Sequence, residues 1–293
     1  MKIGIIGAGS IGLLFAHFLN DHHDVTLYCR RKEQADAINE KGIKLINKDI
    51  RSVKKVSATC SLKSLVKEQL VIVAVKQYGI RAVVDQLKNV PMNIPLLFLQ
   101  NGMGHLDDLK TLPYTSIVLG TVEHGAYRLS DHVVHFTGCG RTILAMYRGK
   151  SELSFTFAKQ LSKQGFPFEA TENYEKMLMD KLIVNAVINP LTALLQVKNG
   201  QLVTNPYYFQ LMKSVFYEVA NVLELTDQDD EFRRIVSICE KTGENYSSMC
   251  KDVMEGRQTE IDGILGFLLK KAEGKSYPLS LLKFLYNAVK GME

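Results

Sequence analysis

Short apolar runs separated by polar turns, with one helical pattern among them, fill the first third of the chain. A β-type run at 2–6 leads into a glycine-rich turn, a helical pattern at 11–19 and a second apolar run at 25–28. Two further continuous apolar runs, at 70–79 and 94–104, have the composition of parallel strands that are covered on both faces. This order predicts an α/β domain with a parallel, Rossmann-type sheet.

Hydrophobic and polar residues alternate within the stretch 116–145. The alternation is clear in DHVVHF (131–136) and RTILAM (141–146), and glycines lie between these segments. A period of two residues is typical of strands with one buried face. We expect antiparallel strands here that complete the sheet.

Helical patterns dominate from about residue 171 onward, and no internal repeat is present. We predict five helices in this part of the chain, at 174–195, 207–224, 229–243, 245–255 and 260–272. The change of pattern places a boundary near residue 172. It separates a Rossmann-like domain at 1–172 from an all-helical domain at 173–293.

The composition is that of a globular protein with a small excess of positive charge. Of the 293 residues, 46% are hydrophobic, which is enough for sizeable cores. The 36 Lys and Arg residues against 31 Asp and Glu residues give a net charge of +5 without a long basic run. This pattern argues against nucleic-acid binding and favours a small anionic ligand. Without a leader segment or a run of about eighteen apolar residues, we expect neither secretion nor a membrane span.

Cysteines and histidines form no metal signature in the sequence. The five cysteines are widely spaced, and they indicate reduced packing residues in a cytoplasmic protein. His124, His132 and His135 lack a flanking carboxylate or cysteine at a suitable spacing. We therefore predict no metal site.

The turn GAGSIG follows the first apolar run and opens the first helical pattern. Glycines at this spacing allow a tight turn, close approach of the backbone to a pyrophosphate, and close contact between helix and strand. The helix N-terminus adds N–H groups and a partial positive charge. We assign the turn to dinucleotide binding, with a purely structural glycine turn as the alternative; the residues are Gly7, Gly9, Ser10, Ile11 and Gly12.

Basic residues follow the second apolar run, where dinucleotide-binding domains read the adenosine ribose. An acidic residue there suits NAD, whereas an arginine suits the 2′-phosphate of NADP. This chain has Arg30, Arg31 and Lys32, so we predict NADP, although the same charges would also suit a solvated surface. Lys76 and the turn at 100–102 end the next two strand patterns and should face the cofactor or the substrate. A surface lysine and a turn chosen for its backbone are the alternatives.

A polar stripe runs along the apolar helix predicted at 174–195. Lys181, Asn185 and Asn189 recur every four residues and therefore share one side of the helix. Burying an ammonium and two amides without partners is unfavourable by several kcal/mol, so the stripe should line a cleft for a polar ligand. Pro190 lacks an N–H and predicts a kink beside Asn189. A kinked core helix with a snorkelling lysine is the alternative.

Three segments together resemble the ketopantoate reductases (2-dehydropantoate 2-reductases). They are KLIVNAVINPLTALL at 181–195, NGMG at 101–104 and ENYSSMCKDVMEGRQTEID at 244–262. The resemblance implies an NADP-binding Rossmann domain and a helical domain that share a cleft. It departs at Gln100, where some members have histidine, and at Glu123 in GTVEHGA, where small hydroxyl residues also occur.

The resemblance also implies roles for individual residues. Lys181 is similar to the catalytic lysine of the family, and Glu260 to a second site residue that also lies near the cofactor. Substrate contacts are implied for the side chains of Asn101, Asn185, Asn189 and Ser248. Cofactor contacts are implied for Arg30, Lys76 and Asn101, in addition to the glycine turn.

The implied reaction is NADPH-dependent reduction of ketopantoate to (R)-pantoate. Lys181 would polarise the keto oxygen and protonate the developing alkoxide. Glu260 could instead serve the helix N-terminus after Thr259, and Ser248 could cap a helix rather than bind substrate. Related reductases of other branched 2-keto or acetohydroxy acids, and a sensor that binds the dinucleotide without turnover, are the alternatives.

We further expect closure on ligand binding and allow a homodimer through amphipathic segments at 265–269 and 279–285.

Overall fold

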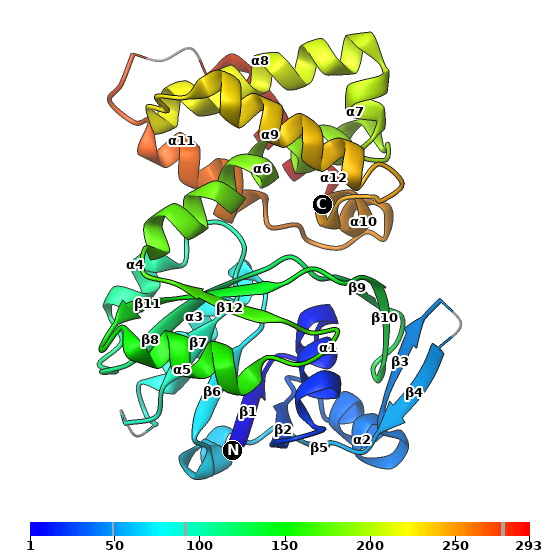
Figure 1. Cartoon of the computed structure of the whole chain (residues 1–293), viewed down its shortest axis with the longest axis vertical. Coiled ribbons are helices and arrows are strands. Elements are labelled where there is room, and N and C mark those ends of the chain that lie inside the picture. Colours follow the sequence, from blue (N-terminus) through cyan, green and yellow to red (C-terminus); the bar gives the residue numbers. More distant parts are fainter. Residues whose placement is uncertain (49, 91–92, 277–278) are drawn as a thin grey trace. The chain divides into compact units, whose positions relative to one another are not determined.

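The chain forms two compact units. The computed structural model describes residues 1–48, 50–90, 93–276 and 279–293 (Figure 1). Its contacts separate a sheet unit, Met1–Gln100 with Asp107–Met177, from a helical unit, Asn101–Leu106 with Leu178–Glu293. The short segment Asn101–Leu106 therefore belongs with the helices, although it lies in the first half of the sequence.

The main sheet of the sheet unit has eight strands, and the six from β5 to β8 are parallel. Strands β2 and β6 lie on either side of β1, so the chain first builds outward through β2 and β5 and then returns to build through β6, β7 and β8. This is the strand order of a doubly wound Rossmann fold, which confirms the predicted fold class. In spatial order the strands are β12 (Phe168–Thr171), β11 (Thr142–Arg148), β8 (Ile117–Val122), β7 (Leu96–Phe98), β6 (Leu70–Val73), β1 (Lys2–Ile6), β2 (Asp24–Tyr28) and β5 (Ser57–Thr59).

Two strands extend the parallel part of this sheet. Strand β11 pairs with β8 in antiparallel fashion, as expected for the RTILAM segment. Strand β12 then adds to β11 in parallel orientation, with Thr142 opposite Phe168. The strand at 168–171 was not among the predicted elements. Four residues are too few for alternation to stand out, and the pairing depends on β11 rather than on local sequence.

A second sheet accounts for the other alternating segment. Its four strands lie in the order β4 (Ile50–Lys54), β3 (Ile43–Asn47), β10 (Val133–Gly138) and β9 (Gly125–Arg128). The expectation that 131–136 completes the main sheet was therefore wrong. Val134 and Phe136 are buried, and β10 packs with β3 and β9 against helix α1 (Ser10–Leu19). Alternation reports one buried face but does not say which sheet the strand joins.

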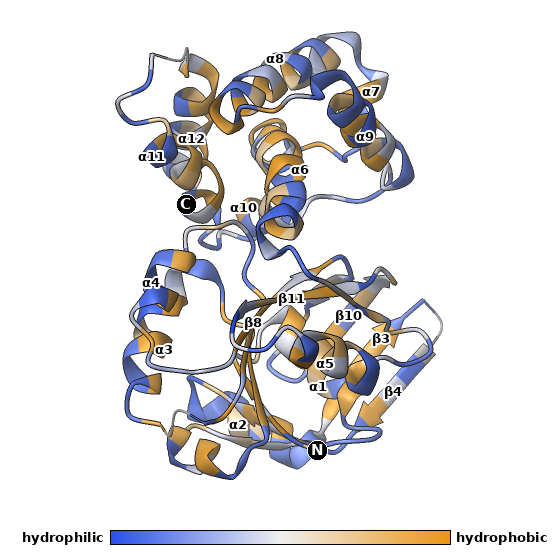
Figure 2. Cartoon of the chain, turned by 60° about the vertical axis from the view of Figure 1, so that its left-hand side comes forward, coloured by the Kyte–Doolittle hydropathy of each residue, from blue (hydrophilic) through white to orange (hydrophobic). Residues whose placement is uncertain are grey.

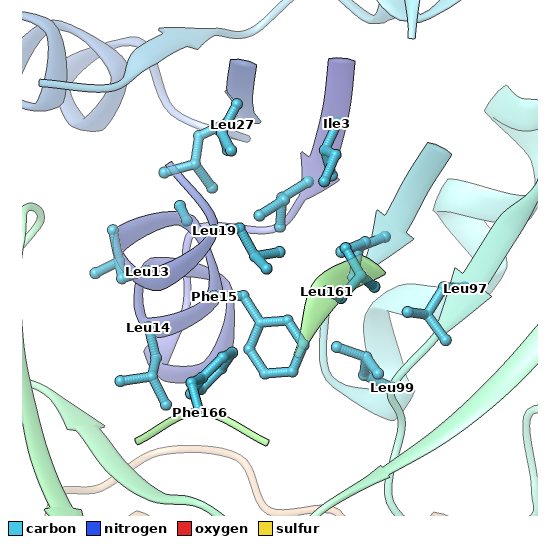
Figure 3. Close-up of a cluster of buried hydrophobic side chains, with 14 of the residues drawn as sticks. Ile3, Leu13, Leu14, Phe15, Leu19, Leu27, Leu97, Leu99, Leu161 and Phe166 are labelled. Carbon is cyan, nitrogen blue, oxygen red and sulfur yellow. The ribbon is translucent and has the colours of Figure 1, made fainter. Parts of the chain in front are cut away.

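The core of the sheet unit gathers around α1. Figure 3 shows Leu13, Leu14, Phe15 and Leu19 of this helix among side chains of the strands, with Phe166 beside Phe15. The rings of Phe15 and Phe166 meet edge to face at 5.0 Å. This packing holds the middle of α1 against the segment that precedes β12. The other helical elements of this unit are α2 (Lys32–Lys41), η1 (Leu62–Lys67), η2 (Gln77–Gly79), α3 (Ile80–Leu87), α4 (Leu106–Lys110) and α5 (Glu152–Leu161).

Each of the five helices predicted for the second half is present in the helical unit, whereas the helices at Gln201–Thr204 and Ser280–Met292 were not predicted. Helix α6 begins at Tyr174 and ends at Leu195, as predicted, and it continues through Pro190. The helix predicted at 260–272 contains a π-helical turn at Asp262–Gly266, and that predicted at 245–255 begins later, at Ser248. The remaining helices are α7 (Gln201–Thr204), α8 (Pro206–Leu223), α9 (Gln228–Lys241), α10 (Ser248–Met254), α11 (Phe267–Lys271) and α12 (Ser280–Met292).

The burial of these helices bears on two expectations from the sequence, the membrane span and the packing of the amphipathic segments. By length and composition α6 could cross a membrane, but 61% of its most apolar window is buried inside the protein, which is typical of a core helix. Figure 2 shows both apolar and polar segments on α6. The amphipathic segments at 265–269 and 279–285 pack internally, with Leu265, Leu282 and Leu285 buried and Phe284 exposed.

Candidate active site

The glycine turn follows β1, at the point where the strand order reverses. Gly7 has φ +105°, a conformation that side chains rarely adopt, and its N–H donates to the carbonyl of Tyr28 at 3.0 Å. A Cβ atom on Gly12 would lie 1.8 Å from the carbonyl oxygen of Gly7. The first and third glycines are therefore required by the turn itself.

The middle glycine is different, because the space in front of it is open. A Cβ atom on Gly9 would meet no atom within 4 Å. The first hydrogen bond inside α1 runs from the N–H of Leu13 to the carbonyl of Gly9, and no side chain of the described residues caps this helix. The N–H groups of Ser10, Ile11 and Gly12 are thus left for a ligand, which fits a pyrophosphate at a helix N-terminus.

The two arginines after β2 have different surroundings. The guanidinium of Arg31 is paired with the carboxylate of Asp131, which also lies 3.5 Å from Arg128. Arg30 is exposed, and no acidic side chain among the described residues pairs with it. Of the two, Arg30 is the one whose charge is available to a phosphate. Gln34 of α2 joins this region to the glycine turn, since its amide donates to the carbonyl oxygens of Ala8 at 2.8 Å and Asp131 at 3.0 Å.

Two of the predicted residues lie at the ends of neighbouring strands. Lys76 follows β6 and is half-buried. Gln100 follows β7 and is buried, and its side-chain amide donates to the carbonyls of Val73 at 2.9 Å and Val75 at 2.8 Å. Gln100 thus ties the carboxyl end of β7 to that of β6. The sequence indicated its place but not this structural role.

The polar stripe on α6 lies among buried side chains. Lys181 and Asn185 are half-buried and Asn189 is 7% exposed, whereas the neighbouring Leu182 and Ala186 are completely buried. A broad solvated face is therefore ruled out for this helix. The stripe presents an ammonium and two amides from an otherwise apolar surface, as a polar substrate would require.

Thr192 connects the stripe to the start of α10. Its hydroxyl, one turn beyond Asn189, donates to the hydroxyl of Ser247 at 2.7 Å. Ser247 in turn accepts from the N–H of Cys250 at 3.0 Å and caps α10. The capping role considered for Ser248 therefore belongs to Ser247, and Ser248 is an exposed residue in the first turn. Thr192 was missed because a threonine in an apolar helix has no motif of its own.

Asn101 and Glu260 meet within the helical unit. The amide nitrogen of Asn101 donates to a carboxylate oxygen of Glu260 at 2.8 Å. Gly102 has φ +76°, and a Cβ atom there would lie 2.1 Å from the carbonyl oxygen of Gly263. The same carbonyl accepts from the N–H of Met103 at 3.3 Å. The NG turn therefore packs directly on the π-helical turn that follows Glu260. Such π-helical turns are frequent at functional sites.

Two of the three histidines considered for metal binding serve other contacts. The ring of His124 stacks on Phe166 at 4.3 Å, and Nδ1 of His135 lies 2.7 Å from the hydroxyl of Tyr127. In the part of the chain that the structure describes, no three His, Cys, Asp or Glu residues are grouped to hold a metal ion. Packing explains both histidines.

Two family models match the chain. The model described as ketopantoate reductase PanE/ApbA matches residues 3–149, and its C-terminal counterpart matches residues 173–293. Named relatives are similar over the full length. The 2-dehydropantoate 2-reductase of Bacillus subtilis is 43% identical over 296 residues, covering 100% of this chain and 98% of the relative. That of Listeria innocua is 41% identical over 297 residues, covering 100% and 97%.

Solved structures agree with these matches. The crystal structure of the "probable 2-dehydropantoate 2-reductase" of Bacillus subtilis has a TM-score of 0.89 at 43% identity and covers 100% of both chains. D-mandelate dehydrogenase with NADH and anilino(oxo)acetate has a TM-score of 0.90 at 24% identity, with 100% and 98% covered, and at that identity the likeness concerns the fold alone. The chain belongs to the ketopantoate reductase family.

Proposed function

We propose that the chain reduces 2-dehydropantoate (ketopantoate) to (R)-pantoate with NADPH. Support comes from family membership and from relatives of that name that are 40% to 43% identical over the whole chain. The observation that carries the proposal is the half-buried lysine on α6, in line with two asparagines on an apolar helix. This arrangement supplies a cation and amide donors to an oxygen that becomes negative.

The sheet unit holds the cofactor in this proposal. The N–H groups at the start of α1 bind the pyrophosphate, and the open space at Gly9 admits it. Arg30, after β2, binds the 2′-phosphate, and Lys76 lies after β6, on the other side of β1. The cofactor, when bound, supplies the hydride that goes to the keto carbon.

The helical unit holds the keto acid. Lys181 donates a hydrogen bond to the keto oxygen and transfers one ammonium proton to it as negative charge develops there. Asn185, Asn189 and Ser248 donate to the carboxylate and keto oxygens and thereby orient the carbon to be reduced. Glu260, already an acceptor for Asn101, accepts a second hydrogen bond from the substrate hydroxyl.

Loss of NADPH absorbance with a panel of keto acids tests the proposal. The panel contains ketopantoate, other branched 2-keto acids and acetohydroxy acids, each with NADPH and with NADH. We expect ketopantoate with NADPH to give the highest kcat/KM. Preference for another acid would identify a related reductase, and cofactor binding without any turnover would identify a sensor. Arg30→Ala should lower the preference for NADPH over NADH about tenfold, because the 2′-phosphate loses its cation.

We further propose a cytoplasmic enzyme that self-associates as a homodimer. Exposed apolar side chains of the helical unit support the self-association, since Leu211 of α8 is 41% exposed and Phe284 of α12 is 59% exposed. Sedimentation equilibrium of the wild type and of Phe284→Ser would test it. A monomer at all concentrations would exclude the dimer.

A further inference from the structure

Glu293, which follows α12, has a side-chain carboxylate that points inward. One oxygen accepts from the backbone N–H of Thr259 at 3.0 Å and from the hydroxyl of Thr259 at 2.6 Å. The side chain of Glu293 is 10% exposed, and Thr259 is 2% exposed. Two donors of one buried residue therefore depend on this single carboxylate oxygen.

Thr259, held by Glu293, also binds the backbone at the start of the following helix. Its hydroxyl oxygen accepts from the N–H of Ile261 at 3.2 Å, so it fixes the backbone on the far side of Glu260. The N–H of Gly263 then donates to the carbonyl of Glu260 at 3.1 Å. Glu260 is thus held between a residue bound by Glu293 and the first turn of the π-helical segment.

The last turns of α12 also hold Asp262. The hydroxyl of Tyr286 donates to one oxygen of Asp262 at 2.7 Å, and the ammonium of Lys290 lies 3.2 Å from the other. Lys290 is also 2.7 Å from the second oxygen of Glu293. Glu293 therefore fixes Thr259, and the end of α12 fixes Asp262. These two residues lie on either side of Glu260 in sequence.

The side-chain carboxyl of Glu293 is ionised in the folded protein. Burial alone would raise the pKa of its carboxyl, but the hydrogen bonds from Lys290 and Thr259 outweigh burial and lower the pKa. The carboxylate is consequently ionised at neutral pH and accepts both hydrogen bonds from Thr259 without a proton of its own.

We propose that Glu293 is a positioning residue for Glu260: it binds Thr259 and so aims the Glu260 carboxylate at Asn101 and at the substrate hydroxyl. The inference rests on the proposed role of Glu260 in holding the keto acid. Glu293 itself touches neither substrate nor cofactor. Its effect is therefore expected in the binding of the keto acid and not in the binding of NADPH.

Steady-state kinetics of Glu293→Ala test the assignment. We expect KM for ketopantoate to rise about tenfold, with a smaller change in kcat and an unchanged dissociation constant for NADPH. Glu293→Gln keeps an oxygen that can accept from Thr259, so most of the affinity should be retained. Glu273→Gln, which alters an exposed carboxylate of the same unit, is the matched control and should behave as the wild type.

A double-mutant cycle separates positioning from general stability. In a Glu260→Gln background, Glu293→Ala should change kcat/KM by less than about twofold, because the group it positions is already altered. Full additivity of the two effects, or a wild-type KM for Glu293→Ala, would overturn the assignment. Thr259→Val removes one of the two donors and serves the same cycle if Glu293→Ala does not fold.

Amide hydrogen exchange over 259–262 gives a readout that needs no turnover. Faster exchange in Glu293→Ala than in Glu273→Gln supports positioning even if the wild type reduces a different keto acid. Equal exchange in the two variants contradicts it. Failure of the wild type to consume NADPH with ketopantoate would instead contradict the proposed function, so the two hypotheses fail on different measurements.

Discussion

The side chain of Asn101 donates a 2.8 Å hydrogen bond to Glu260, although the two residues are separated by 159 positions in sequence. The contact depends on Gly102, whose place beside the carbonyl of Gly263 leaves no room for a Cβ atom. A glycine in a turn thus fixes the distance between an amide and a carboxylate that are both proposed to meet the substrate.

Gly102→Ala should disrupt this pair. The added methyl would lie 2.1 Å from a backbone oxygen at a φ of +76°, so the turn must move away from the π-helical segment. We expect kcat/KM for the keto acid to fall at least tenfold and the free energy of unfolding to fall by about 1–3 kcal/mol. Gly256→Ala is the control, since its φ is +61° but no atom lies within 4 Å of the added methyl. Equal losses in both variants would mean that backbone conformation alone is responsible.

The glycine turn after β1 predicts two different kinds of defect. Gly12→Ala would place a methyl 1.8 Å from the carbonyl oxygen of Gly7, so this variant should be unstable in thermal unfolding. Gly9→Ala meets nothing within 4 Å, and its φ of −81° suits alanine, so the melting temperature should stay within a few degrees of the wild type. Its affinity for NADPH, measured by fluorescence titration, should nevertheless fall at least tenfold, because the methyl enters the space proposed for the pyrophosphate. Unchanged affinity would remove the pyrophosphate from this position.

Lys181→Ala should remove the proposed proton donor. We expect kcat to fall about 10²- to 10⁴-fold, the usual contribution of a general acid, while the dissociation constant for NADPH stays constant. Lys176→Ala, which alters an exposed lysine of the same helix, is the matched control. Near-normal turnover of Lys181→Ala would rule out the proposed role of this ammonium.

Two buried histidines predict a loss of stability in acid. Burial, with the nearby charge of Lys54, lowers the pKa of His17 to about 4, and burial lowers that of His105 to about 4. In the unfolded chain both titrate near 6.5, so between pH 6.5 and pH 4 the unfolded state binds more protons. The stability is therefore complete above pH 6.5 and decreases as the pH falls toward 4. Denaturant unfolding should show a loss of about 2 kcal/mol per histidine between pH 7 and pH 5.

Single replacements assign this pH dependence to its residues. His17→Gln should flatten the part of the curve that belongs to the sheet unit, whereas His22→Gln alters an exposed residue and should leave the curve unchanged. A curve with the wild-type slope in His17→Gln would show that other groups cause the acid sensitivity.

The sequence predicted those parts of the fold that depend on local patterns. The glycine turn, the start of α1 within one residue and the whole of α6 follow from spacing and periodicity alone. The sheet joined by β10 could not be predicted, because a strand with one buried face can pair in either sheet. Capping of α10 was considered for Ser248, whereas Ser247 provides it, since neighbouring serines are equivalent in sequence.

The candidate site divides in the same way. The stripe on α6 was visible because its three polar residues repeat at a helical spacing. Thr192, Gln34 and Glu293 were not visible, because each acts through hydrogen bonds to residues far away in sequence. Such contacts have no periodic signal and become evident only when the chain is folded.

The assignment of Asn101–Leu106 to the helical unit bears on how the protein can be divided. An expression fragment that stops near residue 172 would carry this loop without the helices that accompany it. Met103 and His105, at 8% and 1% exposure in the whole chain, would be presented to solvent. A fragment starting after 172 would in turn lack the loop at 101–106, which binds Glu260 and Gly263. Gene halves made at that point should therefore aggregate when produced separately, and should gain solubility when co-expressed or when the loop is grafted onto the second half.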